Sequence, residues 1–248
     1  MPRVLREILI ALGLAVVLTT VVWLVLNSAV YKSRWDEVWA RRTVLFGSWL
    51  TTVGISLAAL VLTIVVSILL VAGQRAGSVV LKRSCQVYVE FVRGTPLLVQ
   101  LYLFFFVVAP AIGLHNGHVA GAIVLAAFSA AYLAEIIRGG IESIPEAQRE
   151  AARAVGFTTA QAYRFVIIPQ TIRRILPATA GEFANLIKNS SLLSVVAVSE
   201  LTKEIRDAAN ITYVAFEFYI PLAVAYLILT VPIALGARWL ESKFAYAT

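Results

Sequence analysis

Charged side chains are scarce in this 248-residue sequence, and their scarcity excludes an ordinary soluble domain. Only 14% of the residues are Asp, Glu, Lys or Arg, whereas 60% are hydrophobic. Soluble domains carry about 25% charged residues. The apolar residues gather in long runs that each suit a membrane-spanning helix. We therefore predict an all-α integral membrane protein.

Cysteine and histidine are almost absent, and several kinds of site are excluded with them. Cys85 is the only cysteine, so a disulfide framework and a cysteine metal cluster are ruled out. His115 and His118 share one short segment without neighbouring carboxylates, and we predict no metal site there. We attribute the net charge of +7 to basic residues at the cytoplasmic membrane face rather than to nucleic-acid binding.

The sequence also lacks the motifs of an ATP-hydrolysing enzyme. No G-x4-G-K-[ST] phosphate loop occurs, so the chain cannot hydrolyse ATP by that route. No grouping of a nucleophile, a base and an orienting residue is visible on an aqueous face. We predict that the chain is not an enzyme, and an intramembrane enzyme or a scaffold is a remote alternative.

Six apolar stretches are long enough to cross a bilayer, which requires about 20 residues. We predict spans at 8–30, 47–72, 86–108, 119–137, 175–198 and 216–240, the last interrupted by Pro221 and Pro232. A cleaved secretory signal is the alternative for the first stretch, but signal cores are only about 7–15 residues long. Most Lys and Arg residues outside the spans fall on the side of the N-terminus, which places both termini in the cytoplasm.

One polar island, residues 145–177, interrupts the apolar sequence and must lie at an aqueous face. Pro145 suits a first helical turn, and Glu146 and Glu150 place negative charge near the positive end of the helix dipole. Gly156 is typical of a helix C-terminus. We predict a second short element at 158–165 and a break at Pro169. The pair of helices could sit in a groove on another protein, or form an ordinary amphipathic loop.

Ionisable and polar residues inside the predicted spans indicate a cavity or contacts between helices. Arg93 and Gln100 share a face of the third span, with Gly94 and Pro96 between them permitting a kink. Further polar faces carry Tyr132, Glu135 and Arg138 on the fourth span and Glu182, Asn185, Lys188 and Asn189 on the fifth. These groups suit a zwitterionic ligand. Ion pairs such as Glu90 with Arg93, or Glu135 with Arg138, are the purely structural alternative.

Four segments together resemble the permease subunits of ABC transporters for polar amino acids. Glu150-Ala151-Ala152, Gly156 and Ile168-Pro169 resemble the EAA loop of that family, with Val166 and Ile168 where its pattern has Ile and Leu. The other three resembling segments are 90–100, 131–140 and 185–192. The resemblance implies a type I ABC importer permease fold with a five-span core at 47–248, a coupling loop at about 145–177, and an extra N-terminal transmembrane helix with an interfacial segment at 1–46.

The resemblance also implies the roles of particular residues. Those that would couple to an ATPase are Glu146, Glu150, Ala151, Ala152, Gly156 and Pro169. Those that would line the substrate path are Arg93, Thr95, Gln100, Tyr132, Glu135, Lys188, Asn189 and Ser190.

The implied assembly lies in the cytoplasmic (inner) membrane of a bacterium. Its partners would be two ABC ATPase subunits, a second permease subunit, identical or different, and an extracytoplasmic amino-acid-binding protein. The chain itself would contact membrane lipid and bind no cofactor, because the ATPase subunits would use the ATP and Mg²⁺.

The neutral side chain of Asn189, preceded by Lys188, favours an acidic or neutral polar amino acid such as glutamate, aspartate or glutamine. In relatives, an acidic residue at this position would suit a cationic substrate. The alternative function is an ion-coupled secondary amino-acid transporter that uses Glu135, Glu182 and Lys188 as relays. That class is often built from inverted repeats, and we find none in the sequence.

Overall fold

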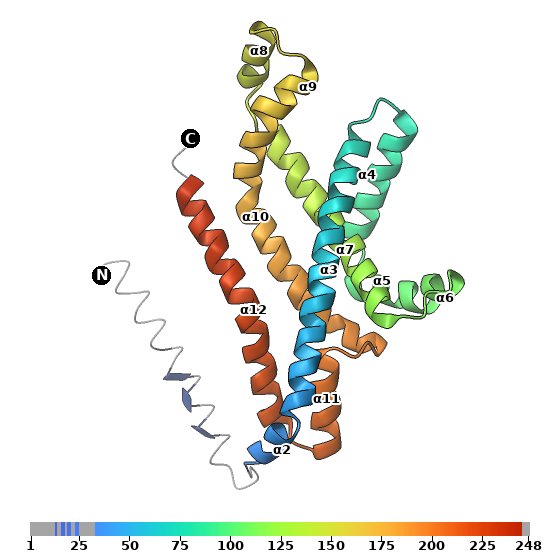
Figure 1. Ribbon diagram of the computed structural model, residues 1–248, viewed down its shortest axis with the longest axis vertical. Coiled ribbons are helices and arrows are strands. Elements are labelled where there is room, and N and C mark those ends of the chain that lie inside the picture. Colours follow the sequence, from blue (N-terminus) through green and yellow to red (C-terminus); the bar gives the residue numbers. More distant parts are fainter. Residues whose placement is uncertain (1–12, 14–15, 18, 21–22, 25–32, 245–248) are drawn as a thin grey trace. The chain divides into compact units, whose positions relative to one another are not determined.

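The computed structural model describes residues 33–244 and, before them, 13, 16–17, 19–20 and 23–24. Every regular element over 33–244 is helical, as predicted (Figure 1). The α-helices are α2 (Trp35–Ala40), α3 (Arg42–Gln74), α4 (Val79–Gly94), α5 (Leu97–Leu103), α6 (Ala109–Ala111), α7 (Gly117–Glu142), α8 (Glu146–Ala154), α9 (Thr159–Ala162), α10 (Ile168–Asn189), α11 (Leu201–Thr212) and α12 (Ala215–Phe244). Two π-helical segments, η1 (Phe104–Val108) and η2 (Tyr163–Ile167), and the 3₁₀ segment η3 (Ser190–Val196) complete the set.

The chain consists of two compact units, Met1–Arg42 and Thr43–Thr248. In the first unit, α2 carries Asp36 and Glu37 in its opening turn. Most of the predicted span at 8–30 lies outside the described residues. The second unit contains the coupling loop and all the predicted path residues, and the remaining paragraphs concern this unit.

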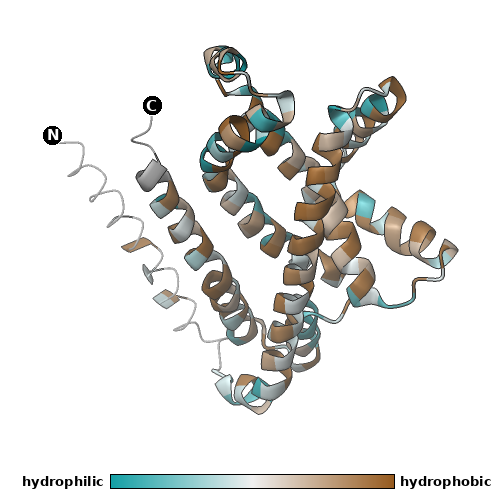
Figure 2. Ribbon diagram, turned by 45° about the horizontal axis from the view of Figure 1, so that its top comes forward, coloured by the Kyte–Doolittle hydropathy of each residue, from teal (hydrophilic) through white to brown (hydrophobic). Residues whose placement is uncertain are grey.

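Three helices in the described part of the chain are long and apolar enough to cross a membrane: α3, α7 and residues 215–240 of α12. The α4–α5 pair adds a fourth if its two halves form one broken span. The predicted fifth span differs, because α10 is amphipathic and is not among these candidates. Figure 2 shows long hydrophobic stretches on α3 and α12, whereas α8 is largely hydrophilic.

The predicted third span is not one straight helix. Its two halves, α4 and the helical run 97–111, are bent relative to each other by 110°. The kink predicted from Gly94 and Pro96 is therefore confirmed, and the predicted span at 86–108 is a bent pair of helices rather than one straight helix. The Gln100 amide braces the break, since its Nε2 donates to the Val92 carbonyl (2.9 Å) and to Thr95 Oγ1 (2.8 Å). The first bond satisfies the Val92 carbonyl, whose usual helical partner would be the N–H that Pro96 lacks.

Three prolines predicted to interrupt helices do not do so. Pro169 lies in the first turn of α10, directly after the wide turn of η2, and the helical backbone runs through both. A first turn tolerates proline because its N–H needs no helical partner. Pro221 and Pro232 lie within α12, which continues past both. The predictions of a break at Pro169 and of interruptions at 221 and 232 were therefore wrong.

Two buried apolar clusters hold the helices together. One joins α3, α5, α7, α10 and η3, and the other joins α3, α4, α7 and η2. Along α3 several polar side chains bond to their own helix, for example Thr63 Oγ1, which donates to the Ala59 carbonyl at 2.7 Å. In the chain, α10 packs along both α7 and α12. The coupling loop precedes α10 and α11 follows its far end, so α10 connects these two polar regions (Figure 1).

Candidate functional site: a coupling helix beside a polar cavity

The helix α8 begins after Pro145 and ends in a glycine cap, as the sequence predicts. Gly156 has a φ of +85°, the left-handed region. Its N–H donates to the Arg153 carbonyl at 2.9 Å, and the Phe157 N–H donates to the Ala152 carbonyl at 3.0 Å. This bond pair is the Schellman motif. It turns the chain sharply and starts α9, whose Thr158 forms a capping box with Gln161.

In the single chain, the outer face of α8 is exposed and can contact another molecule. Ala152 is the one buried residue of the helix, whereas Glu150 and Ala151 are exposed. Beyond the helix, Val155 is 71% exposed and Phe165 58% exposed, next to the ring of Phe157. The exposed surface therefore combines small, acidic and large apolar side chains at a polar end of the chain.

Basic side chains fasten this loop to the neighbouring helices. Arg149 donates to the Ile141 carbonyl in α7 at 3.0 Å, and Arg174 of α10 donates to the Ser143 carbonyl at 2.6 Å. The Tyr163 hydroxyl of η2 accepts a 3.0 Å hydrogen bond from Arg75, just after α3. The sequence analysis assigned these residues no such role, because their partners are distant in the sequence or are backbone carbonyls.

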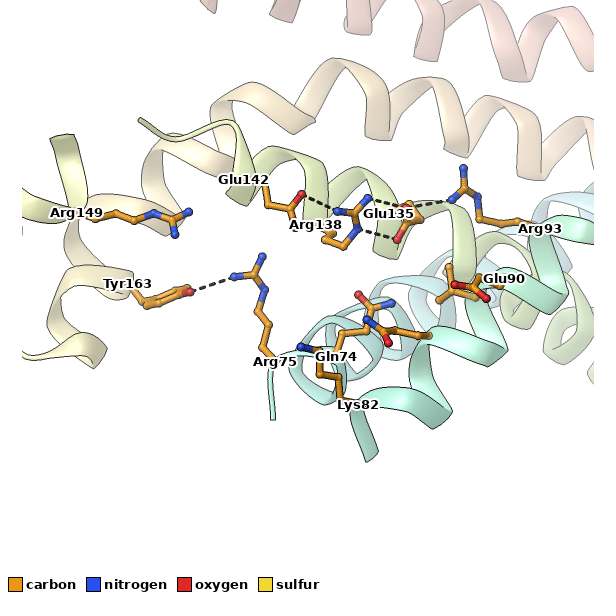
Figure 3. A pocket seen from close by; sticks show the side chains of 12 residues that line it. Gln74, Arg75, Lys82, Glu90, Arg93, Glu135, Arg138, Glu142, Arg149 and Tyr163 are labelled. Carbon is orange, nitrogen blue, oxygen red and sulfur yellow. Dashed lines mark hydrogen bonds and ion pairs between the residues drawn. The ribbon is translucent and has the colours of Figure 1, made fainter. Parts of the chain in front are cut away.

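A polar cavity of about 760 Å³ opens beside the loop (Figure 3). Its lining comes from the end of α3, α4, the second half of α7, α8 and η2. The lining residues are Gln74, Arg75, Lys82, Gln86, Val89, Glu90, Arg93, Glu135, Arg138, Glu142, Arg149 and Tyr163. We call it the polar cavity. It contains two of the predicted path residues, Arg93 and Glu135.

One ion-pair network crosses this cavity. Glu135 binds Arg138 through two hydrogen bonds of 2.9 Å and also pairs with Arg93 at 3.1 Å. Arg138 in turn donates to Glu142 at 2.6 Å. The pair of Glu135 and Arg138 was given as the structural alternative in the sequence analysis, which likewise paired Arg93 with Glu90 on its own helix. In the structure Arg93 joins α4 to α7, and its guanidinium lies 5.7 Å from the centre of the Tyr132 ring.

The other predicted path residues lie elsewhere. Thr95 and Gln100 contact each other at the break between α4 and α5. The junction of α10 and η3 contains Lys188, Asn189 and Ser190, and none of these residues lines the polar cavity. Ser190 is fully buried and donates to the Ile187 carbonyl at 2.7 Å. The structure of the single chain therefore divides the predicted path into three groups.

Glu200 lies at a buried junction of three helices that the sequence analysis did not predict. It is fully buried and caps α11, accepting from the Lys203 N–H (2.8 Å) and the Thr202 N–H (2.9 Å). Its carboxylate also accepts from Thr52 of α3 and Tyr226 of α12, both at 3.3 Å. Three helices, α3, α11 and α12, therefore bind the one carboxylate of Glu200. Glu200 itself lies outside the candidate spans.

We expect a Glu200→Gln variant to lose part of the pH dependence of stability. Burial raises the pKa of Glu200, so the protonated form is favoured in the folded state. Its stabilising contribution is complete below the unfolded pKa of about 4.3 and is lost as pH rises through the raised folded value. Between pH 5 and pH 8 the Tm in detergent should therefore fall more for the wild type than for Glu200→Gln. Glu204→Gln, at a half-buried position of α11, is the control, and equal slopes for the wild type and Glu200→Gln would contradict the prediction.

Comparisons with known proteins identify the family. The sequence model of the binding-protein-dependent transport system inner membrane component matches residues 68–246. The probable glutamine ABC transporter permease protein GlnM of Bacillus subtilis (strain 168) is 42% identical over 157 residues, which are 63% of this chain and 72% of that protein. The glutamine transport system permease protein GlnP of Escherichia coli (strain K12) is 30% identical over 211 residues, 84% of this chain and 96% of that one.

Solved structures agree with this result. A crystal structure of an amino acid ABC transporter with histidines superposes with a TM-score of 0.78 at 32% identity, over 86% of this chain and 100% of that chain. An inward-facing MetNI methionine ABC transporter shares the fold, with a TM-score of 0.65 at 21% identity over 85% of this chain and 99% of that one. On the evidence of the matching family model and the E. coli relative, this chain belongs to the family of binding-protein-dependent transport system inner membrane components, the ABC importer permeases.

Proposed function

We propose that this chain is the permease subunit of an ATP-driven importer that moves a polar amino acid, acidic or neutral, across the cytoplasmic membrane of a bacterium. Its partners would be two ABC ATPases, a second permease and an extracytoplasmic binding protein. Two relatives described above are glutamine permeases by name, which favours glutamine within this class. Both termini would lie in the cytoplasm, on the side of the coupling loop.

The observation that carries this proposal is the exposed helix α8 with its glycine cap. A helix that exposes Glu150 and Ala151 and is followed by exposed Val155 presents a compact docking surface. Arg149 ties that surface to α7, and Arg174 of α10 binds Ser143 at the end of α7, just before α8. A movement of α8 with an attached ATPase would therefore pass into two long helices at once, which is what alternating access requires.

The polar groups of α4, α7 and α10 support a path for a zwitterion between the helices. Tyr132 and the ion pair of Arg93 with Glu135 lie between α4 and α7. Hydrogen bonds between Gln100 and Thr95 stabilise the break between α4 and α5, at which backbone groups can face a ligand. Lys188, Asn189 and Ser190 would complete the path, and the neutral Asn189 supports a substrate without a cationic side chain.

Reconstituted uptake tests this function. The chain, candidate ATPase subunits and binding protein are placed in proteoliposomes, and uptake of radiolabelled glutamine, glutamate, aspartate and arginine is measured with ATP or a non-hydrolysable analogue inside. We expect uptake of an acidic or neutral amino acid that requires both ATP and the ATPase subunits.

Two outcomes would contradict the proposal. Uptake by the chain alone on an ion gradient would instead establish the secondary transporter. Glu135 is poorly suited to that function as a proton relay, because two arginines hold its carboxylate. Uptake restricted to arginine, lysine or histidine would overturn the substrate class while leaving the ATP-driven mechanism in place.

A further inference from the structure

The polar cavity has charged groups left over after its internal ion pairs are formed. Arg93, Arg138, Glu135 and Glu142 neutralise one another. Arg75, Lys82 and Glu90 also line the cavity and belong to none of the ion pairs among residues 33–244. The lining of the cavity therefore includes both positive and negative charges that its internal ion pairs do not use (Figure 3).

A second observation points to a missing ligand. Gln74 lines the cavity, yet its side chain is only 8% exposed, and Oε1 has no hydrogen-bond partner among the described residues. Arg149 Nε, on another wall, is also buried without a hydrogen-bond acceptor. Buried polar atoms are normally paired, and an exception calls for a bound partner. Gln74 Oε1 lacks a hydrogen-bond donor, and Arg149 Nε lacks a hydrogen-bond acceptor.

The lining restricts the class of the ligand. Val89 is the one aliphatic residue among the twelve that line the cavity, so an acyl chain or an apolar compound finds little surface. A polyphosphate would face three carboxylates, those of Glu90, Glu135 and Glu142. The volume of about 760 Å³ is in the usual range for small-molecule sites. A small zwitterion matches the free charges, and its ammonium group supplies the donor that Gln74 Oε1 lacks.

We propose that the polar cavity binds a free zwitterionic amino acid, with its carboxylate on Arg75 and Lys82 and its ammonium group toward Gln74 and Glu90. The choice of an amino acid, rather than another zwitterion, rests on the proposed function. The cavity lies on the side of the coupling loop, so this ligand would come from the compartment into which substrate is released. Because Arg75 also binds Tyr163 of η2, occupancy is linked directly to the position of the loop.

A phosphatidylethanolamine headgroup shares this chemistry, since it also carries an anion and an ammonium group. The test therefore measures equilibrium binding of radiolabelled L-glutamine and L-glutamate to the purified full chain in nanodiscs, with and without phosphatidylethanolamine. No ATPase, binding protein or transport is needed. Failure of uptake and failure of binding are thus separate results.

Two variants remove the proposed contacts and one is a matched control. Gln74→Leu removes the amide at nearly constant size, and Arg75→Gln removes the cation. Arg83→Gln makes the same charge change as Arg75→Gln at a basic residue of α4 that does not line the cavity. Loss of a hydrogen bond to a charged group weakens binding by about tenfold or more. We expect that loss in Gln74→Leu and Arg75→Gln, and a change of less than about twofold in Arg83→Gln.

Each result decides the proposal. Saturable binding in both kinds of nanodisc, weakened by the two cavity variants, supports a free amino acid as the occupant. Binding that appears only without phosphatidylethanolamine supports the site and assigns the lipid headgroup as its occupant in the membrane. The proposal is overturned if the wild type shows no saturable binding in either nanodisc, or if Gln74→Leu and Arg75→Gln bind as the wild type does. Arg75→Lys, which keeps the charge, should retain binding and so exclude misfolding as the cause of a loss.

Discussion

A Gly156→Val variant is expected to lose about tenfold in ATP-driven uptake and to release the ATPase during purification, at an unchanged protein level. The φ of +85° at this position lies in a region that a β-branched residue adopts only under strain. Leaving that region breaks both capping bonds and displaces Val155 and Phe157 from the docking surface. The strain is about 1–2 kcal/mol, and 1.4 kcal/mol corresponds to a factor of ten in the docked population.

The cause is conformational rather than steric, and the controls separate the two. A Cβ built on Gly156 meets no atom within 4 Å, so crowding does not enter. Gly156→Asn should keep most of the activity because asparagine tolerates the left-handed region. Gly181→Val makes the same exchange in α10, where the glycine has an ordinary φ and open space, and should couple normally. Normal uptake by Gly156→Val would contradict the assignment of this cap to coupling.

The coupling helix could be predicted from sequence because its signals are local. The predicted start at Pro145 and the glycine at 156 bracket the observed helix, Glu146–Ala154, closely. The capping box that starts α9 likewise depends on residues three apart, Thr158 and Gln161. The kink at Pro96 followed from the missing N–H of a single residue. Such features depend on nearby atoms, which the sequence displays directly.

The polar contacts between helices were harder to predict, because the fold selects among several candidate partners. Arg93 could reach Glu90 one turn away, but the 110° turn after α4 and the packing of α4 on α7 bring it to Glu135. The buried junction at Glu200 was not predicted at all. Its partners Thr52 and Tyr226 are 148 and 26 residues distant, and no local pattern connects them.

The second large effect is expected where α7 crosses α10. Gly140 is buried, and a Cβ added there would lie 2.1 Å from Ile175 Cγ2 and 3.2 Å from Thr171 Cγ2. Gly140→Ala should therefore force the helices apart, at a cost of about 1–3 kcal/mol that exceeds the gain of roughly 0.5–1 kcal/mol in helix propensity. We expect a Tm several degrees below the wild type in detergent, because 1 kcal/mol shifts the Tm of a chain of this size by about 2–4 °C.

A double variant tests whether this one contact is responsible. Ile175→Ala removes the methyl group that blocks the new Cβ, so the double variant Gly140→Ala with Ile175→Ala should lose less stability than the sum of the two single variants, although Ile175→Ala by itself loses packing. Gly139→Ala is the matched control, because the adjacent glycine has no atom within 4 Å of an added Cβ and gains only helix propensity. If Gly139→Ala and Gly140→Ala lowered the Tm equally, close approach of α7 and α10 at Gly140 would not be the constraint. Because both helices are fastened to the coupling loop, a partial return of uptake in the double variant would further show that their spacing transmits its movement.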